Sequence, residues 1–178
     1  VRDVAYAQIP RAARARRHTA AADWIERVAG EREYEEIIGY HLEQAFRYRL
    51  ELGPVGDHER DVATRAAALL GKGGRRAVVR GDIRGAANLL ERARALLPTG
   101  DRDRLELALP LSQCLFDAGA YGRCRELLAE ALDEAAQQGD EQLEMHLQAQ
   151  HAWLRSYWEP EGFLEEAEEI ATRALRVF

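Results

Sequence analysis

The sequence is poor in the residues that β-sheets, disulfide scaffolds and membrane spans require. Valine, isoleucine and threonine together supply 18 of its 178 residues, whereas alanine and leucine supply 53. Because alanine and leucine are strong helix formers, this composition predicts an all-α fold and argues against a β-sandwich or a parallel-sheet enzyme. The longest apolar runs fall far short of the ~20 residues that cross a bilayer, so no transmembrane helix is expected.

Cysteine is also scarce. Cys114 and Cys124 are too few for a secreted disulfide scaffold. The first residues include Arg2 and Asp3, and no apolar stretch follows them, so a signal peptide is not expected either. The sequence therefore predicts a cytoplasmic protein, and its start at Val1 suggests a fragment of a longer chain.

Lysine is almost absent, with Lys72 alone against 24 arginines, and the charges are unevenly placed. Residues 1–30 carry a net charge of +3, whereas residues 117–178 carry a net charge of −9. Nucleic-acid binding needs clustered cations that release phosphate counterions, so it is not expected of the acidic part. The segment Arg11–Arg17 is the one place that could contact DNA, and a solvated helix face with ion pairs is the plainer interpretation.

Glycine and proline divide the chain into segments with helical periodicity. Asp82, Asp101 and Asp140 stand where helix N-caps are expected. Pro110 predicts that its helix begins late or bends, and three glycines at 71, 73 and 74 predict a kink or a close helix contact. No strand is expected. The predicted helices cover residues 10–30, 32–52, 57–80, 82–97, 102–118, 121–138, 140–158 and 161–177.

An internal repeat emerges when the segments starting at Gly81, Gly119 and Gly162 are aligned, with spacings of 38 and 43 residues. Small or aliphatic residues recur five, eight, nine and twelve positions after each glycine. A glycine allows a tight turn between helices, and small side chains let two antiparallel helices approach closely. The sequence therefore predicts helix pairs that stack on one another. The small residue five positions after the glycine is Ala86, Cys124 or Ala167.

Residues 81–98 resemble the turn and second helix of a tetratricopeptide repeat, including the closing Pro98. The second and third copies lack that proline, and the third has Arg155 where the family has a small residue. The resemblance implies a right-handed superhelix of antiparallel helix pairs, a tetratricopeptide-like solenoid. The implied repeats cover about 57–98, 101–139 and 140–178, after a helical linker at 1–56.

The N-terminal part resembles a narrower group, the STAND-type signalling ATPases of bacteria. The resemblance lies in Val1–Tyr6, Arg17–His18, Ala22–Glu26 and Tyr34–Ala45. These regulators carry a helical-repeat sensor after the nucleotide-binding domain. The resemblance implies that residues 1–56 follow an ATPase module upstream, and that the repeats form a sensor or scaffold of a signalling or transcriptional regulator.

Motifs for catalysis, cofactors or metals are not found. The run Leu70–Gly74 lacks the first glycine and the final hydroxyl residue of a phosphate-binding loop. His146 and His151 are five residues apart, roughly 140° around a helix, which does not suit a shared metal ion. Cys124 fills a small-residue position and is expected to be buried and inert. We therefore expect no catalytic residues, no metal and no cofactor, and predict that the chain is not an enzyme.

The aromatic residues near the third copy are the most suggestive feature. Trp153 and Tyr157 share one helix face at i, i+4, Trp158 is expected to point elsewhere, and the three either pack in the core or form a binding surface. The tetratricopeptide resemblance implies a concave face lined by the first helix of each pair, which would bind a protein or a small effector. The implied contact residues are Arg75, Val79, Gln113, Phe116, Asp117, Trp153 and Ser156.

Two alternatives remain open. The chain could be a stand-alone protein–protein adaptor, or a DNA-contacting module that uses Arg11–Arg17. In addition, the apolar stripe of the helix at 161–178 predicts self-association, because a solenoid covers such a stripe with its next repeat or a cap.

Overall fold

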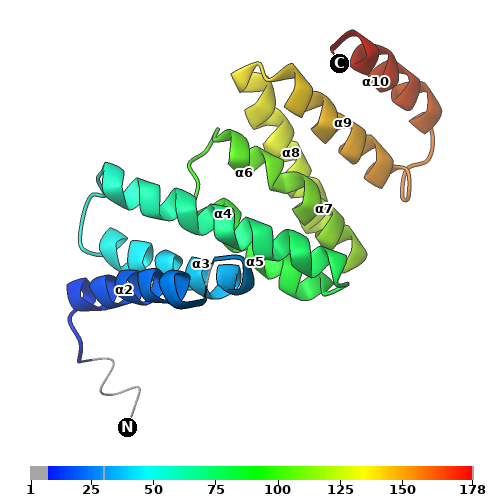
Figure 1. Cartoon of the computed structure of the whole chain (residues 1–178). Helices are drawn as coiled ribbons and strands as arrows, with labels where there is room; N and C mark the ends of the chain where they lie inside the picture. Colours follow the sequence, from blue (N-terminus) through cyan, green and yellow to red (C-terminus); the bar gives the residue numbers. More distant parts are fainter. Residues whose placement is uncertain (1–7, 30, 178) are drawn as a thin grey trace.

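The computed structural model describes residues 8–29 and 31–177, and within them it is all-helical (Figure 1). The described part contains no strand, so the predicted fold class is confirmed at the level of all-α. No helix in this part is long and apolar enough to span a bilayer. The helices are α2 (Arg11–Ala29), α3 (Glu31–Leu50), α4 (Asp57–Val79), α5 (Ile83–Ala95), α6 (Arg102–Glu106), α7 (Ala108–Asp117), α8 (Tyr121–Gln138), α9 (Glu141–Arg155) and α10 (Phe163–Val177).

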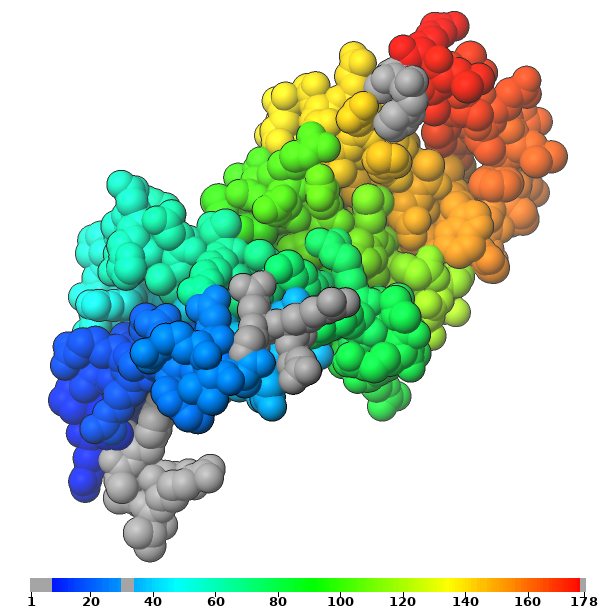
Figure 2. All heavy atoms as spheres, in the orientation of Figure 1, coloured from blue at the N-terminus to red at the C-terminus, as the bar shows by residue number. Residues whose placement is uncertain are grey.

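The helices pack in the order of the sequence. Each helix makes its main contacts with a close sequence neighbour, from α2 on α3 through to α9 on α10. The result is an elongated molecule with α2 at one end and α10 at the other (Figures 1 and 2). The segment that contains α2 and α3 packs directly on α4. The superhelical winding that the tetratricopeptide resemblance implies remains a prediction.

The turns at Gly81 and Gly119 have the same backbone structure. Both glycines are left-handed, with φ of +76° and +75°, and Gly162 follows with +74°. In the first two turns, the N–H after the glycine donates to the carbonyl five residues earlier, at 3.0 Å and 2.8 Å. A left-handed residue is strained unless it is glycine. Gly81 and Gly119 therefore mark turns of one type, and Gly162 shares their left-handed backbone.

The small residues that follow these turns are buried in the first two copies. Ala86 and Cys124 have no exposed surface, and the leucines nine positions after the glycine, Leu90 and Leu128, are also buried. Ala167 in the third copy is half-buried, because α9 is the main helix that packs against α10. Burial of a leucine side chain stabilises the fold by about 1.5–3 kcal/mol. The hydrophobic core accordingly runs along the molecule between the paired helices.

The glycines within α4 allow other elements to approach closely. A Cβ atom at Gly74 would lie 2.7 Å from Cγ of Leu90, and one at Gly73 would lie 2.6 Å from Cγ of Glu36. Both distances are shorter than carbon atoms tolerate. Of the two predicted outcomes, a kink or a close contact, the structure shows the close contact, and α4 continues through the glycines without a break.

Local signals set the helix boundaries. The carboxylates of Asp82, Asp101 and Asp140 accept hydrogen bonds from first-turn N–H groups of α5, α6 and α9, which confirms the predicted N-caps. The helix around Pro110 is interrupted at Leu107, so that α6 and α7 are separate. A proline ring clashes with the carbonyl four residues earlier, which explains the break.

Candidate functional site

Five aromatic side chains from three parts of the chain meet around Phe116. We call Phe116, Tyr121, Trp153, Tyr157 and Trp158 the aromatic cluster. The ring centroid of Phe116 lies 4.9 Å from that of Tyr157, 5.3 Å from Tyr121, 6.0 Å from Trp158 and 6.4 Å from Trp153. Aromatic pairs attract one another at centroid distances of about 4.5–7 Å. The cluster therefore joins the end of α7, the start of α8 and the end of α9.

The position of Trp158 corrects a prediction. The sequence predicted a helix that continues to residue 158, with Trp158 pointing away from Trp153 and Tyr157. However, α9 ends at Arg155, and a turn follows in which the Trp158 N–H donates to the Arg155 carbonyl at 3.0 Å. The turn brings Tyr157 and Trp158 to the same ring, that of Phe116.

The aromatic cluster borders a hollow of about 430 Å³. Its walls come from α7, α8 and the turn after α9, and several of the rings are open to solvent. Tyr157 is 62% exposed, Tyr121 50% and Trp153 41%. Ligand pockets commonly measure about 300–1,000 Å³ and are lined by aromatic side chains with few polar groups. The lining residues are Phe116, Tyr121, Arg125, Tyr157 and Trp158.

Most of the contact residues predicted on α7 and α9 lie together. Gln113 Nε2 donates to Asp117 Oδ1 at 2.8 Å, and Gln150 Nε2 donates to Gln113 Oε1 at 3.4 Å. Phe116 and Trp153 are both members of the aromatic cluster. These contacts place the predicted residues of α7 next to α9.

The remaining predicted contact residues divide into two groups. Ser156 lies just after α9, where its Oγ donates to the Trp153 carbonyl at 2.7 Å. Arg75 and Val79 are exposed on α4, and within the described ranges no hydrogen bond, ion pair or ring contact connects them to the aromatic cluster. The predicted set omitted Tyr121 and Arg125, although their i, i+4 spacing directly after the Gly119 turn was a usable signal.

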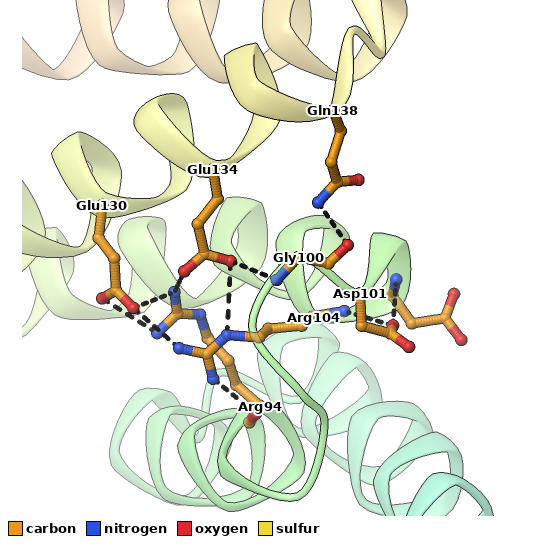
Figure 3. A network of polar contacts seen from close by, with 8 residues as sticks. Arg94, Gly100, Asp101, Arg104, Glu130, Glu134 and Gln138 are labelled. Carbon is orange, nitrogen blue, oxygen red and sulfur yellow. Dashed lines mark hydrogen bonds and ion pairs between the residues drawn. The ribbon is translucent and has the colours of Figure 1, made fainter.

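A group of charged side chains, which we call the ionic cluster, links α5 and α6 to α8 (Figure 3). It consists of Arg94, Arg104, Glu130 and Glu134. Arg104 Nη2 donates to Glu130 Oε1 at 2.8 Å, and Arg94 Nη2 lies 3.2 Å from the same oxygen. Glu134 Oε2 accepts from the backbone N–H of Gly100 at 3.0 Å. Two arginines paired with two glutamates compensate one another, so this cluster fastens helices together.

The electrostatics of Glu130 agree with that interpretation. Partial burial opposes its ionisation, but hydrogen bonds and charges from Arg94 and then Arg104 outweigh the burial and lower its pKa. Unlike the exposed Glu130, Glu43 on α3 is a buried carboxylate, only 1% exposed, and it pairs with Arg92 of α5 at 2.9 Å. The lowered pKa keeps Glu130 charged as a partner of the two arginines, and Glu43 joins α3 to α5.

Two histidines on separate helices come into contact. His18 Nδ1 on α2 lies 2.9 Å from His41 Nδ1 on α3, and their ring centroids are 5.1 Å apart. Burial lowers the pKa of both imidazoles, and the charge of His41 lowers that of His18 further. Among residues 8–29 and 31–177, no group of three or more histidine, cysteine or carboxylate side chains is placed to hold a metal ion.

The cysteines are buried thiols in the described structure. Cys124 Sγ donates to the Ser112 carbonyl at 3.3 Å, in the contact between α7 and α8. Burial raises the pKa of Cys124, and burial followed by the charge of Asp117 raises that of Cys114. A thiol with a raised pKa is a poor nucleophile. The expected burial and low reactivity of Cys124 are supported.

The basic segment of α2 already uses part of its charge within the chain. Arg11 Nε pairs with Glu51 at 2.6 Å. Arg14 Nε donates to the Ile9 carbonyl at 2.8 Å, and its guanidinium lies 5.5 Å from the Tyr48 ring centroid. These contacts match the solvated helix face that the sequence allowed as the plainer interpretation.

No protein-family model matches this chain, and no curated protein or solved structure matches it either. The aromatic cluster and its hollow are therefore the features of this chain that bear on its function.

Proposed function

We propose that this chain is a non-catalytic helical-repeat sensor or scaffold module that binds a protein or small effector at the aromatic cluster. The convergence of four aromatic side chains around an open hollow of about 430 Å³, with Trp153 packed beside them on Phe116 and Tyr157, carries this proposal. Exposed tryptophan and tyrosine side chains supply much of the energy at binding sites, because they bury large areas at low entropic cost.

The lining of the hollow suits binding. Its rings offer stacking surfaces, the hydroxyls of Tyr121 and Tyr157 offer hydrogen bonds, and Arg125 offers one positive charge. The rings are held in place by one another and by the turn that follows α9. A ligand would therefore meet a largely preformed site, which reduces the entropic cost of binding.

The proposed setting is a cytoplasmic bacterial signalling or transcriptional regulator with an ATPase domain upstream. The resemblance of residues 1–56 to the STAND-type ATPases supports this setting. The hollow lies where α7, α8 and the end of α9 meet. A ligand that prefers one arrangement of these helices would shift their equilibrium and so the arrangement of any attached domain.

The alternatives make different predictions. If the chain is a stand-alone adaptor, the full-length protein contains no ATPase domain, and partner binding does not depend on one. A DNA-contacting module would bind through Arg11–Arg17, and its affinity would fall steeply with salt concentration. If the protein does not bind duplex DNA at low salt, the second alternative is excluded.

The proposed binding site can be tested with the three indole N–H signals of Trp24, Trp153 and Trp158 in ¹⁵N-labelled protein. We expect members of a fragment collection of mixed charge to shift the Trp153 and Trp158 signals, and we expect Trp24 on α2 to stay unchanged. The variant Tyr157→Ala should weaken the binding of these fragments and leave the helical circular dichroism unaltered. The proposal fails if no fragment of any charge moves the Trp153 or Trp158 signal.

A further inference from the structure

The hollow contains one charged lining residue, and that residue is unpaired. Arg125 forms no ion pair or hydrogen bond within the described part of the chain. By contrast, Arg123 on the same helix pairs with Glu91. An uncompensated guanidinium beside an apolar wall attracts a carboxylate, which it can hold by two parallel hydrogen bonds.

The surroundings do not neutralise Arg125 directly. Asp117, the acid closest in sequence to Phe116, accepts its hydrogen bond from Gln113 and is absent from the lining. Tyr121 is the first residue of α8, whose N-terminal turn receives no side-chain cap from Ala120. The positive end of the helix dipole at this turn adds to the charge of Arg125.

The walls of the hollow set the shape and size of the ligand. Phe116, Tyr121, Tyr157 and Trp158 present rings, which favour a planar aromatic body in stacked or edge-to-face contact. The volume of about 430 Å³ lies in the lower half of the range of roughly 300–1,000 Å³ found for ligand pockets. The hollow therefore fits a molecule of one or two rings better than a run of peptide residues.

We propose that the hollow binds a small aromatic carboxylate, with its ring among Phe116, Tyr157 and Trp158 and its carboxylate paired with Arg125. This inference rests on the proposed binding function, and it selects a small effector over a protein partner. Charge complementarity selects an acid over an amine, and ring stacking selects an aromatic body over an aliphatic one.

Three probes of one shape test the charge preference: 2-naphthylacetate, its uncharged amide, and 2-(2-naphthyl)ethylammonium. Titrations are followed at the indole N–H signals of Trp24, Trp153 and Trp158. We expect the acetate to shift the Trp158 and Trp153 signals and to bind roughly fivefold to tenfold more tightly than the amide, as for a charge-assisted hydrogen bond. The ammonium probe should bind most weakly.

The variant Arg125→Gln should reduce the affinity for the acetate by about the same factor and leave the affinity for the amide unchanged. Arg123→Gln, which removes a charge two residues away, is the matched control and should preserve the preference for the acetate. Equal binding of acetate and amide, tighter binding of the ammonium probe, an effect of Arg123→Gln equal to that of Arg125→Gln, or no binding of the acetate at Trp158 would each overturn the proposal.

These results separate the two levels of inference. If neutral or cationic fragments bind beside Trp158 and the acetate holds no advantage, the ligand class is wrong and the binding site stands. If fragments of every charge fail to bind there, the proposed function itself is wrong.

Discussion

Glycine at single positions decides how closely the helices approach. A glycine in a helix interior costs about 1 kcal/mol relative to alanine, so Gly74 is retained at a cost in intrinsic helix stability. The compensation is contact, because Leu90 of α5 occupies the space that a Cβ at Gly74 would need. Gly122 in α8 differs, since a Cβ there would meet no atom within 4 Å.

These two glycines predict substitutions of opposite sign. Gly74→Ala should lower the free energy of unfolding by about 1–2 kcal/mol, because overpacking against Leu90 outweighs the gain in helix propensity. Gly122→Ala should raise the free energy of unfolding by up to about 1 kcal/mol. Urea denaturation followed by circular dichroism measures both. A neutral or stabilising Gly74→Ala would show that α4 and α5 separate easily.

The contact between His18 and His41 predicts a pH dependence. Both pKa values are lowered from the ordinary 6.5, so the unfolded chain binds more protons than the folded one below that pH. The free energy of unfolding should therefore be highest above pH 6.5, and it should decline as the pH falls towards the pKa values of the folded state. Burial lowers both pKa values, and the charge of His41 lowers the pKa of His18 further.

Denaturation at several pH values between 7.5 and 5.5 tests this prediction. The double variant His18→Gln, His41→Gln should show a flatter dependence than the unsubstituted protein. His58→Gln serves as the control because His58 lies outside the pair, and it should retain the original slope. Identical slopes in all three proteins would contradict the role of the pair.

At the residue scale, the burial of a side chain was more predictable than the direction in which it points. Ala86 and Cys124 could be predicted as buried because a turn glycine fixes their position on the following helix. The direction of Trp158 could not be predicted, because it depends on where α9 ends. The helix ends at Arg155, five residues before Pro160, the first residue that would mark an end. The contact of His18 with His41 joins residues 23 positions apart, and helix periodicity does not reveal it.

At the scale of elements, the ionic cluster predicts how the helix pairs are coupled. Glu134 on α8 is 8% exposed and lies near both Arg94 and Arg104. Glu134→Gln removes the negative charge between two partly buried guanidinium groups and should lower the free energy of unfolding by about 1–3 kcal/mol. Because nearest-neighbour contacts hold the helices together, the unfolding transition should also broaden.

An exposed ion pair supplies the comparison. Glu51 is 45% exposed and pairs with Arg11 at 2.6 Å, so Glu51→Gln should change the free energy of unfolding by less than about 0.5 kcal/mol. Guanidinium denaturation is unsuitable because it screens ion pairs, so urea is used. Equal effects of the two substitutions would mean that the ionic cluster contributes no more than a surface contact.

Elements were predictable where a local chemical signal marks their ends. The aspartates before α5, α6 and α9 and the glycines after α4 and α7 belong to this class. Pro110 signalled an interruption, but its location at Leu107 follows from the clash of the ring with an earlier carbonyl. The ionic cluster could not be predicted, because it depends on how α8 crosses the loop around Gly100.

At the scale of the whole molecule, α10 presents an apolar surface. Leu164 and Leu175 are 77% and 87% exposed, and Ala171 lies between them at helical spacing. We expect this surface to pair with that of a second copy, since burial of two leucines stabilises a contact by roughly 3–6 kcal/mol before the costs of association. Sedimentation at increasing concentration should show a dimer, and Leu175→Glu should suppress it. A monomer at every concentration would contradict the expectation.

The overall arrangement was predictable to the level of an all-α chain. Alanine and leucine indicate helices, the aligned glycines indicate turns between them, and the structure agrees on both. The lining of the hollow was predictable only in part, because Tyr121 and Arg125 join it through the packing of α8 beside α9. Like the other predicted contact residues, Arg75 and Val79 were predicted to lie on the first helix of a pair. They lie on α4, however, and are not part of the aromatic cluster.

The sequence-local packing of the helices also determines the response to mechanical load. Chain segments close in sequence find one another quickly, so contact formation carries a small loop-closure penalty and folding should be fast. Among the described helices, no packing contact connects the α2 end of the molecule directly with the α10 end. A molecule pulled from its two ends should therefore unravel in successive small steps, one hairpin after another, instead of breaking at a single high force.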